Sequence, residues 1–212
     1  MKQHFDRFEA FLKDVVKARA AHKKAMAELQ AQAEKYGEQY DKDFLQVKRK
    51  ELEQQARAYG EEAAEKAANL LQAIQDAAIE RNSKLDLNDA ALTNALRLVA
   101  AAGSNLGIET IKQINAPFIE AGNTPAIKAL QAVYKSAGIR YDGGLDNYLY
   151  EPEAIRETFR NPTYQTFQQG GSLNQYAVSL SRLARKMGVS DFPTMIDDDG
   201  AFSAMRKAAH LP

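Results

Sequence analysis

The first 83 residues follow one helical rhythm, and this rhythm constrains the fold more than any other feature of the chain. Apolar side chains such as Phe5, Phe8 and Leu12 recur in steps of three and four. This spacing keeps one stripe of an α-helix facing a partner. The stretch has no proline and only two glycines, Gly37 and Gly60. A single helix of this length would measure about 120 Å and could not bury its own stripe. The sequence therefore predicts a long helical arm that packs against another helix.

Two arrangements can supply the second helix. One is a continuous rod that pairs with another copy; the other is a hairpin that turns at 37–41, with Gly37 as its C-terminal cap and Asp41 or Asp43 opening the second helix. A hairpin would bring a basic patch alongside an acidic one, although an antiparallel dimer would do the same. The two patches are Lys13, Lys17, Arg19, Lys23 and Lys24, and Glu61, Glu62 and Glu65. Because a helical glycine costs only about 1 kcal/mol, we favour the continuous rod.

The stripe of the arm predicts self-association into a homo-oligomer. From Tyr40 onward several steps of four follow one another, closer to an eleven-residue than to a seven-residue repeat, which straightens a supercoil. The predicted self-association residues are Met26, Leu29, Ala33, Tyr36, Tyr40 and Phe44.

Composition changes near Ser83, since all six prolines and ten of the twelve glycines follow residue 100. The change predicts a helical arm over 1–83, a three-helix bundle over 84–140, and a Tyr/Gly-rich segment with C-terminal helices over 141–212 that packs with the bundle. No stretch has the alternation of a strand. The predicted fold class is all-α, with a long N-terminal helix, as coiled coil or helical hairpin, before a small multi-helix head.

Local signals set the expected helix boundaries in the head. We expect Asp86 or Asn88 to cap the first helix and Thr124 to cap the third, with Pro125 at its first position. The expected stops are Gly103, Pro117, Gly138 with Ile139, Asn161-Pro162, and Gly188. Ser172 and Gln175 form a capping box, and a last helix is expected from about Gly200, with Phe202, Met205 and Ala209 on its apolar face.

Charge and composition exclude several classes of function. The 28 basic and 28 acidic side chains cancel, so broad binding to nucleic acid or to an anionic membrane is not expected. There is no cysteine, no run of about 18 apolar residues and no signal-peptide pattern after Met1. We expect a cytoplasmic protein without a membrane partner, in the host cytoplasm or the virion if a phage encodes it.

Motifs for catalysis, cofactors or metals are also missing, and we predict no enzyme activity. The run Asp197-Asp198-Asp199-Gly200 resembles the start of a calcium loop but lacks the glutamate at its twelfth position. The three histidines, His4, His22 and His210, have no metal-binding spacing. Gly170-Gly171-Ser172 can present amides to a phosphate, but a helix start explains it without a ligand.

Tyrosines gather in the head, where six of the nine lie within about forty residues. Tyrosine is frequent in binding hot spots, so Tyr141, Tyr148 and Tyr150 are the predicted partner contact. The alternative is that these rings fill the irregular side of the bundle and belong to its core.

Three segments carry a loose resemblance to a known group of proteins: Lys84–Leu92, Ala129–Lys135 and Gln169–Leu173. With the charged Ala/Gln/Glu-rich helix, they resemble small helical proteins encoded in tailed-phage and prophage genomes, often among head and structural genes. The resemblance implies a virion or assembly protein. Scaffolding proteins usually end in a basic helix, and here only Arg206 and Lys207 are basic near the end.

The sequence thus predicts a non-enzymatic phage-type assembly protein. It would self-associate through its N-terminal helix and bind another protein, such as a virion component, through its head. The alternative is a phage-encoded inhibitor or adaptor that binds and blocks a host or defence protein.

Overall fold

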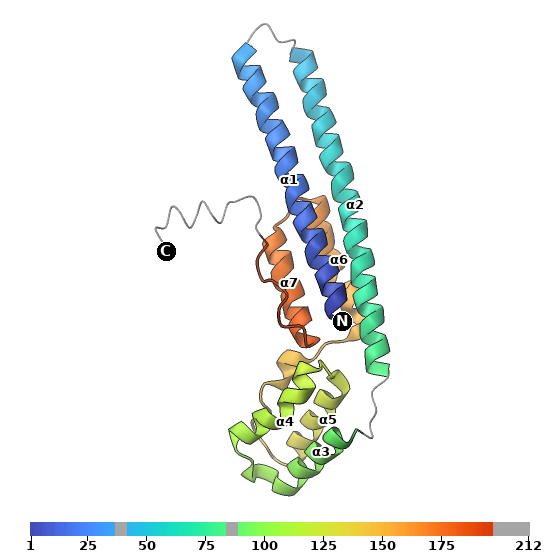
Figure 1. Ribbon diagram of the computed structural model, residues 1–212, viewed down its shortest axis with the longest axis vertical. Helices are drawn as coiled ribbons and strands as arrows, with labels where there is room; N and C mark the ends of the chain where they lie inside the picture. The colour runs from blue at the N-terminus through green and yellow to red at the C-terminus, as the bar shows by residue number, and fades with distance from the viewer. Residues whose placement is uncertain (37–41, 84–88, 197–212) are drawn as a thin grey trace, which may run out of the picture. The chain divides into compact units, whose positions relative to one another are not determined.

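The computed structural model describes residues 1–36, 42–83 and 89–196 (Figure 1). These residues form helices and turns and include no strand, which confirms the predicted all-α fold. The chain divides into two compact units. The first unit comprises Met1–Phe5, Gln72–Arg156 and Ser179–Phe192, and the second comprises Asp6–Leu71, Glu157–Val178 and Pro193–Pro212. These units do not follow the predicted ranges 1–83, 84–140 and 141–212, because the long helices contribute residues to both.

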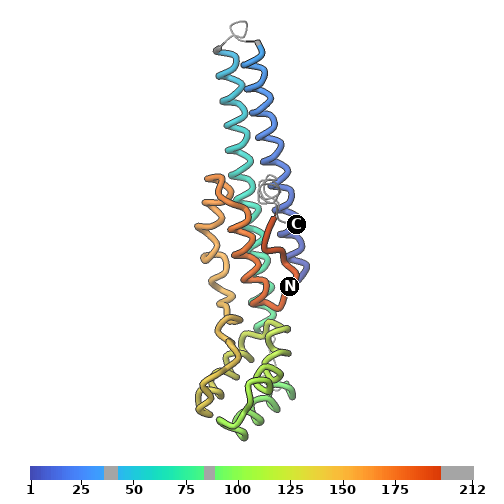
Figure 2. The backbone as a smooth tube through the Cα atoms, turned by 90° about the vertical axis from the view of Figure 1, so that its left-hand side faces the viewer, coloured from blue at the N-terminus to red at the C-terminus, as the bar shows by residue number. Residues whose placement is uncertain are grey.

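The arm is a hairpin, so our preference for a continuous rod is wrong. Helix α1 (Lys2–Tyr36) and helix α2 (Lys42–Ser83) lie side by side and run in opposite directions (Figures 1 and 2). The expected turn at 37–41 lies outside the described residues. The physical reason for the hairpin is burial, because Val15 of α1 and Ala63 and Ala67 of α2 are buried within one chain.

An aromatic core holds the second unit together. The ring of Tyr176 lies 5.1 Å from that of Phe167, 5.8 Å from Phe159 and 6.0 Å from Phe8, measured between centroids. Phe11 packs on Phe167 at 5.5 Å. These rings come from α1, from α6 (Ile155–Thr163), from the π-helical turn η5 (Tyr164–Gln168) and from α7 (Leu173–Lys186). Segments far apart in the sequence thus share one core.

The first unit contains a bundle of α3 (Ala90–Ala102), α4 (Ile108–Glu120) and α5 (Thr124–Ser136). Its shared core is formed by Leu92, Val99, Ile111, Phe118, Ala126, Ile127, Leu130, Tyr134 and Leu145. Short 3₁₀ turns follow these helices at η2 (Gly103–Asn105), η3 (Leu145–Tyr148) and η4 (Pro152–Ala154).

The N-caps of two helices are formed by residues other than those predicted. Asp89, rather than Asp86 or Asn88, caps α3, and its Oδ1 accepts the Ala91 N–H at 2.8 Å. Asn123, rather than Thr124, caps α5 and accepts the Ala126 N–H at 2.9 Å. In both cases several capping residues stand next to one another, so the sequence pattern alone does not select among them.

Two predicted proline stops are wrong. Helix α4 continues through Pro117 to Glu120, and α6 continues through Pro162 to Thr163. Phe118 is buried directly after the first proline, and Thr163 and Thr166 are buried after the second. Burial of these side chains favours continuation of the helix over the local preference of the residue before proline.

The glycine and serine boundaries are confirmed. Helix α3 ends at Gly103, and Ile139 N–H donates to Tyr134 O at 3.0 Å after Gly138, as in a Schellman motif. Ser172 Oγ accepts the Gln175 N–H at 3.4 Å at the start of α7, and α7 ends before Gly188. The helix expected from Gly200 lies outside the described residues.

Candidate functional site

A cavity of about 1300 Å³ lies in the second unit, between α1, α2 and the segment 167–172. We call it the hairpin cavity. Its apolar lining includes Val15, Ala18, Ala21, Ala25, Leu52, Ala56, Ala63 and Phe167. Its polar lining includes Arg19, His22, Lys23, Gln55, Arg57, Tyr59, Gln168, Gln169 and Ser172.

Two glycines allow the backbone to approach closely beside this cavity. A Cβ atom on Gly60 of α2 would lie 2.6 Å from the carbonyl oxygen of Phe167. A Cβ atom on Gly171 would lie 2.8 Å from the carbonyl oxygen of Gln165. Both distances are too short for a side chain. Glycine at position 60 therefore lets Phe167 sit against α2, and glycine at position 171 lets the chain fold back against Gln165 of the preceding turn.

Arg19 fixes the same segment from the side of α1. Its Nη1 donates to Gly171 O at 2.9 Å, and its Nη2 donates to Thr166 O at 2.6 Å. Both acceptors are neutral carbonyls, and within residues 1–36, 42–83 and 89–196 no carboxylate forms an ion pair with Arg19. The guanidinium of Arg19 is half-buried at the cavity wall, and its hydrogen-bond acceptors carry no negative charge.

The described lining carries positive charge and no carboxylate. Arg19, Lys23 and Arg57 are cationic. Arg57 pairs with Glu61, which is not in the lining, at 3.2 Å on the surface of α2. Burial, followed by the nearby Asp14 and Glu62, raises the pKa of Tyr59. The arrangement of apolar wall and cationic groups suits a ligand that has both apolar and acidic groups.

The close packing and the start of α7 account for the residue types in the segment Gly170-Gly171-Ser172, without a bound phosphate. Ser172 serves as the cap, and Gly171 N–H donates to Gln165 O at 3.0 Å. In the part of the chain that the structure describes, no group of three His, Cys, Asp or Glu side chains could hold a metal ion. His210 and the Asp197-Asp198-Asp199-Gly200 run lie outside it.

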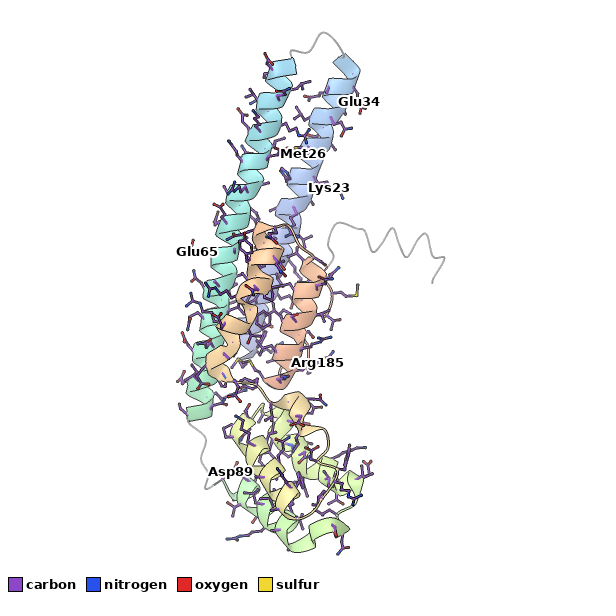
Figure 3. The ribbon with its side chains drawn as sticks, turned by 180° about the vertical axis from the view of Figure 1, so that it is seen from behind. Lys23, Met26, Glu34, Glu65, Asp89 and Arg185 are labelled. Atoms are coloured by element: carbon purple, nitrogen blue, oxygen red, sulfur yellow. The ribbon has the colours of Figure 1, made fainter. Side chains whose placement is uncertain are left out.

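The predicted self-association residues fall on the distal half of the hairpin, the half nearer its turn. Met26, Leu29 and Ala33 are half-buried, and Phe44 is 45 % exposed. Figure 3 labels Lys23, Met26 and Glu34 along this part of α1. Tyr36 ends α1, while Tyr40 lies outside the described residues. The hairpin thus distributes the stripe over two antiparallel helices instead of one continuous helix.

The three predicted partner-contact tyrosines do not share one environment. Tyr141 is 42 % exposed, and Tyr148 is half-buried against the core of the bundle. Tyr150 is only 7 % exposed, and its hydroxyl accepts a hydrogen bond from Arg81 Nη2 at 3.0 Å. Its expected place on an exposed surface is therefore wrong, because its ring is buried and its hydroxyl is bound within the first unit.

The sequence reasoning missed the hairpin cavity. Arg19 and Lys23 were visible in a basic patch, and Gly60 was visible as one of two glycines in the arm. Their common neighbour, the segment 167–172, is more than a hundred positions away from each of them. No signal of local spacing connects residues at such a separation.

Comparison with known proteins identifies no protein similar to this chain. No protein-family model, no curated protein and no solved structure matches this chain. Within the described ranges, no helix combines the length and the apolarity needed to cross a bilayer. A proposal about function must therefore rest on the residues and their geometry.

Proposed function

We propose that this chain is a non-enzymatic assembly protein that pairs with a second copy of itself through the distal half of its hairpin. The observation that supports the proposal is the incomplete burial of the apolar stripe there. Phe44 is 45 % exposed and Val47 is 52 % exposed. They are three residues apart on α2, so they lie on one face of the helix.

The distal hairpin consists of two helical layers without a buried core. After Val15, no described residue of α1 is buried, and before Gly60, no described residue of α2 is buried. In a pair of helices, each helix covers only one side of the other. A two-helix hairpin therefore gains little stabilisation from packing. Full burial of a large apolar side chain contributes about 1.5–3 kcal/mol. A second hairpin laid on this face would bury several such side chains at once.

The α3–α5 bundle is the proposed contact for another protein. Tyr141 is the member of the predicted trio that remains exposed. Tyrosine is enriched in the hot spots of protein–protein interfaces. The resemblance to small helical proteins of tailed phages suggests that the partner is a virion component.

The test is the solution mass of the full chain by light scattering after size exclusion, over a range of concentrations. We expect a mass of twice 23.5 kDa that falls to that of one chain in the double variant Phe44→Glu/Val47→Glu. The matched control is Gln46→Glu/Gln54→Glu, which adds the same charge at exposed polar positions of the same helix. An unchanged mass in the first variant would contradict the assignment of this face.

A monomeric inhibitor or adaptor is the second candidate. It is favoured by one observation, that α1 and α2 bury part of the stripe within a single chain, so the buried half of the hairpin requires no second copy. A wild-type mass of 23.5 kDa at every concentration would move this candidate ahead, with the distal hairpin as the surface that binds a different protein.

A further inference from the structure

We propose that the first unit binds one buried water molecule, which joins the end of α2 to the start of α5. The site is formed by buried polar atoms that have no hydrogen-bond partner in the protein, and we call them the orphan atoms: Arg81 Nε, Asn82 Oδ1 and Thr124 Oγ1. Among the side chains of residues 1–36, 42–83 and 89–196, they are the complete set of such atoms. The site does not depend on self-association of the distal hairpin.

The orphan atoms of Arg81 and Thr124 meet around one carbonyl oxygen. Gly122 O accepts a hydrogen bond from Arg81 Nη2 at 2.8 Å and another from the Thr124 N–H at 3.1 Å. Nε belongs to the same guanidinium as Nη2, and Oγ1 belongs to the same residue as the N–H. Asn82 directly follows Arg81 in α2. The orphan atoms thus gather at one junction, where a single water molecule can bridge them.

The other hydrogen bonds of the Arg81 guanidinium fix the direction of its Nε–H. Nη1 donates to Met187 O at 3.0 Å, and Nη2 donates to the Tyr150 hydroxyl at 3.0 Å as well as to Gly122 O. These acceptors hold the planar group in one orientation. The Nε–H therefore does not turn to solvent, and without a partner it would carry the full desolvation penalty of a buried charged donor.

The chemistry of the orphan atoms selects a neutral ligand that both donates and accepts. Arg81 Nε is a donor, Asn82 Oδ1 is an acceptor, and the Thr124 hydroxyl can act as either. An anion would face the oxygen of Asn82 and the carbonyl oxygens of the junction, and a cation would face the guanidinium. Water accepts from the Nε–H, donates to Oδ1 and shares a hydrogen bond with Oγ1. It then has about three partners, as buried waters typically do.

The burial of the site determines how this water behaves. Thr124 is only 2 % exposed, and the orphan atoms are shielded from solvent. Bulk water therefore cannot satisfy them, and a bound molecule must be enclosed as the chain folds. It exchanges with solvent only when the junction opens locally. We expect its residence time to exceed the tumbling time of the protein.

Water-selective NOESY and ROESY spectra of the ¹⁵N-labelled full chain test the site directly. At the Arg81 Nε–H we expect water cross peaks of opposite sign in the two spectra, as a long-lived bound water produces. The internal control is the Nε–H of Arg97, on the exposed face of α3, which should show exchange peaks of the same sign in both spectra. Same-sign peaks at both arginines, or no peak at Arg81, would overturn the proposal.

A variant tests the partner on α5. Thr124→Val keeps the shape of the side chain and removes one hydrogen bond of the water, so we expect the urea midpoint to fall by about 0.5 M. The opposite-sign peaks at Arg81 should persist, because two partners of the water remain. The matched control is Thr110→Val at an exposed position of α4, which should shift the midpoint by less than about 0.2 M.

Two results for Thr124→Val would also overturn the proposal. A higher midpoint would mean that the hydroxyl has no partner in the native protein, since removal of an unsatisfied buried group is stabilising. Loss of the Arg81 peaks would mean that they come from the hydroxyl proton of Thr124 and not from a bound water.

Discussion

Among the described residues, Tyr134 and Tyr176 are almost completely buried, and the hydroxyl group of each is hydrogen-bonded to a polar side chain. Tyr134 donates to Asn115 Oδ1 at 2.8 Å, and Tyr176 shares a 2.8 Å hydrogen bond with Thr163 Oγ1. Burial, followed by the nearby negative charge of Asp142, raises the pKa of Tyr134 from 10.0 to about 12. A buried phenol that must stay neutral links stability to pH at the scale of a single residue.

The first prediction concerns alkaline pH. Because the pKa of Tyr134 is higher in the folded state than in the unfolded state, its contribution to the free energy of unfolding is complete below pH 10 and is lost as pH rises to about 12. Urea denaturation over this pH range should show the fall. In Tyr134→Phe the decline should be shallower, because one titrating group is removed. An identical slope in both proteins would contradict the assignment.

At the scale of the element, α2 depends on a glycine within its interior. A helical glycine is usually unfavourable relative to alanine by about 1 kcal/mol. At Gly60 the close approach of Phe167 O reverses this preference, since an added Cβ would lie 2.6 Å from that atom. The contact fixes the π-helical turn η5 against α2, and with it one wall of the hairpin cavity.

The second prediction is that Gly60→Ala destabilises the protein. We expect a net loss of about 1–3 kcal/mol, since overpacking against a backbone carbonyl outweighs the gain in helix propensity. Gly107→Ala is the control, because nothing lies within 4 Å of its added Cβ, and its cost should stay below about 1 kcal/mol as the loss of a glycine cap. Both are measured by urea denaturation. A more stable Gly60→Ala protein would show that η5 does not approach α2 so closely.

At the scale of the whole molecule, Arg81 connects segments that are distant in the sequence. Its Nη1 donates to Met187 O at 3.0 Å, and its Nη2 donates to Gly122 O at 2.8 Å and to the Tyr150 hydroxyl at 3.0 Å. The end of α2, the turn before α5 and the end of α7 thus meet at one guanidinium in the first unit. The backbones also approach closely there, because a Cβ on Gly188 would lie 2.1 Å from Glu120 O.

The third prediction follows from this junction. Arg81→Met keeps much of the side-chain volume but leaves two carbonyls and a hydroxyl without their donor, so we expect a loss of about 2–5 kcal/mol in the free energy of unfolding. The control is Arg97→Met on the exposed face of α3, which should change stability by less than about 0.5 kcal/mol. Equal midpoints in urea for the two variants would show that the junction contributes little.

Local chemistry in the sequence was sufficient for the fold class and for several helix ends. The stops at Gly103, Gly138 and Gly188 and the start at Ser172 depend on groups within about five positions of one another, so their signal is contained in a short window. The proline stops at 117 and 162 failed because the burial of later side chains is not visible in such a window.

Only the tertiary structure decided the fold of the arm and the location of the hairpin cavity. An apolar stripe must be covered by another helix, which can come from the same chain or from a second one. The apolar periodicity therefore predicted that residues 1–83 are helical, but it did not determine that α1 and α2 pair with each other. The same reason applies to Arg19 and Gly171, and to Arg81 and Met187. Each pair is in contact only because the folded chain brings together residues that are more than a hundred positions apart.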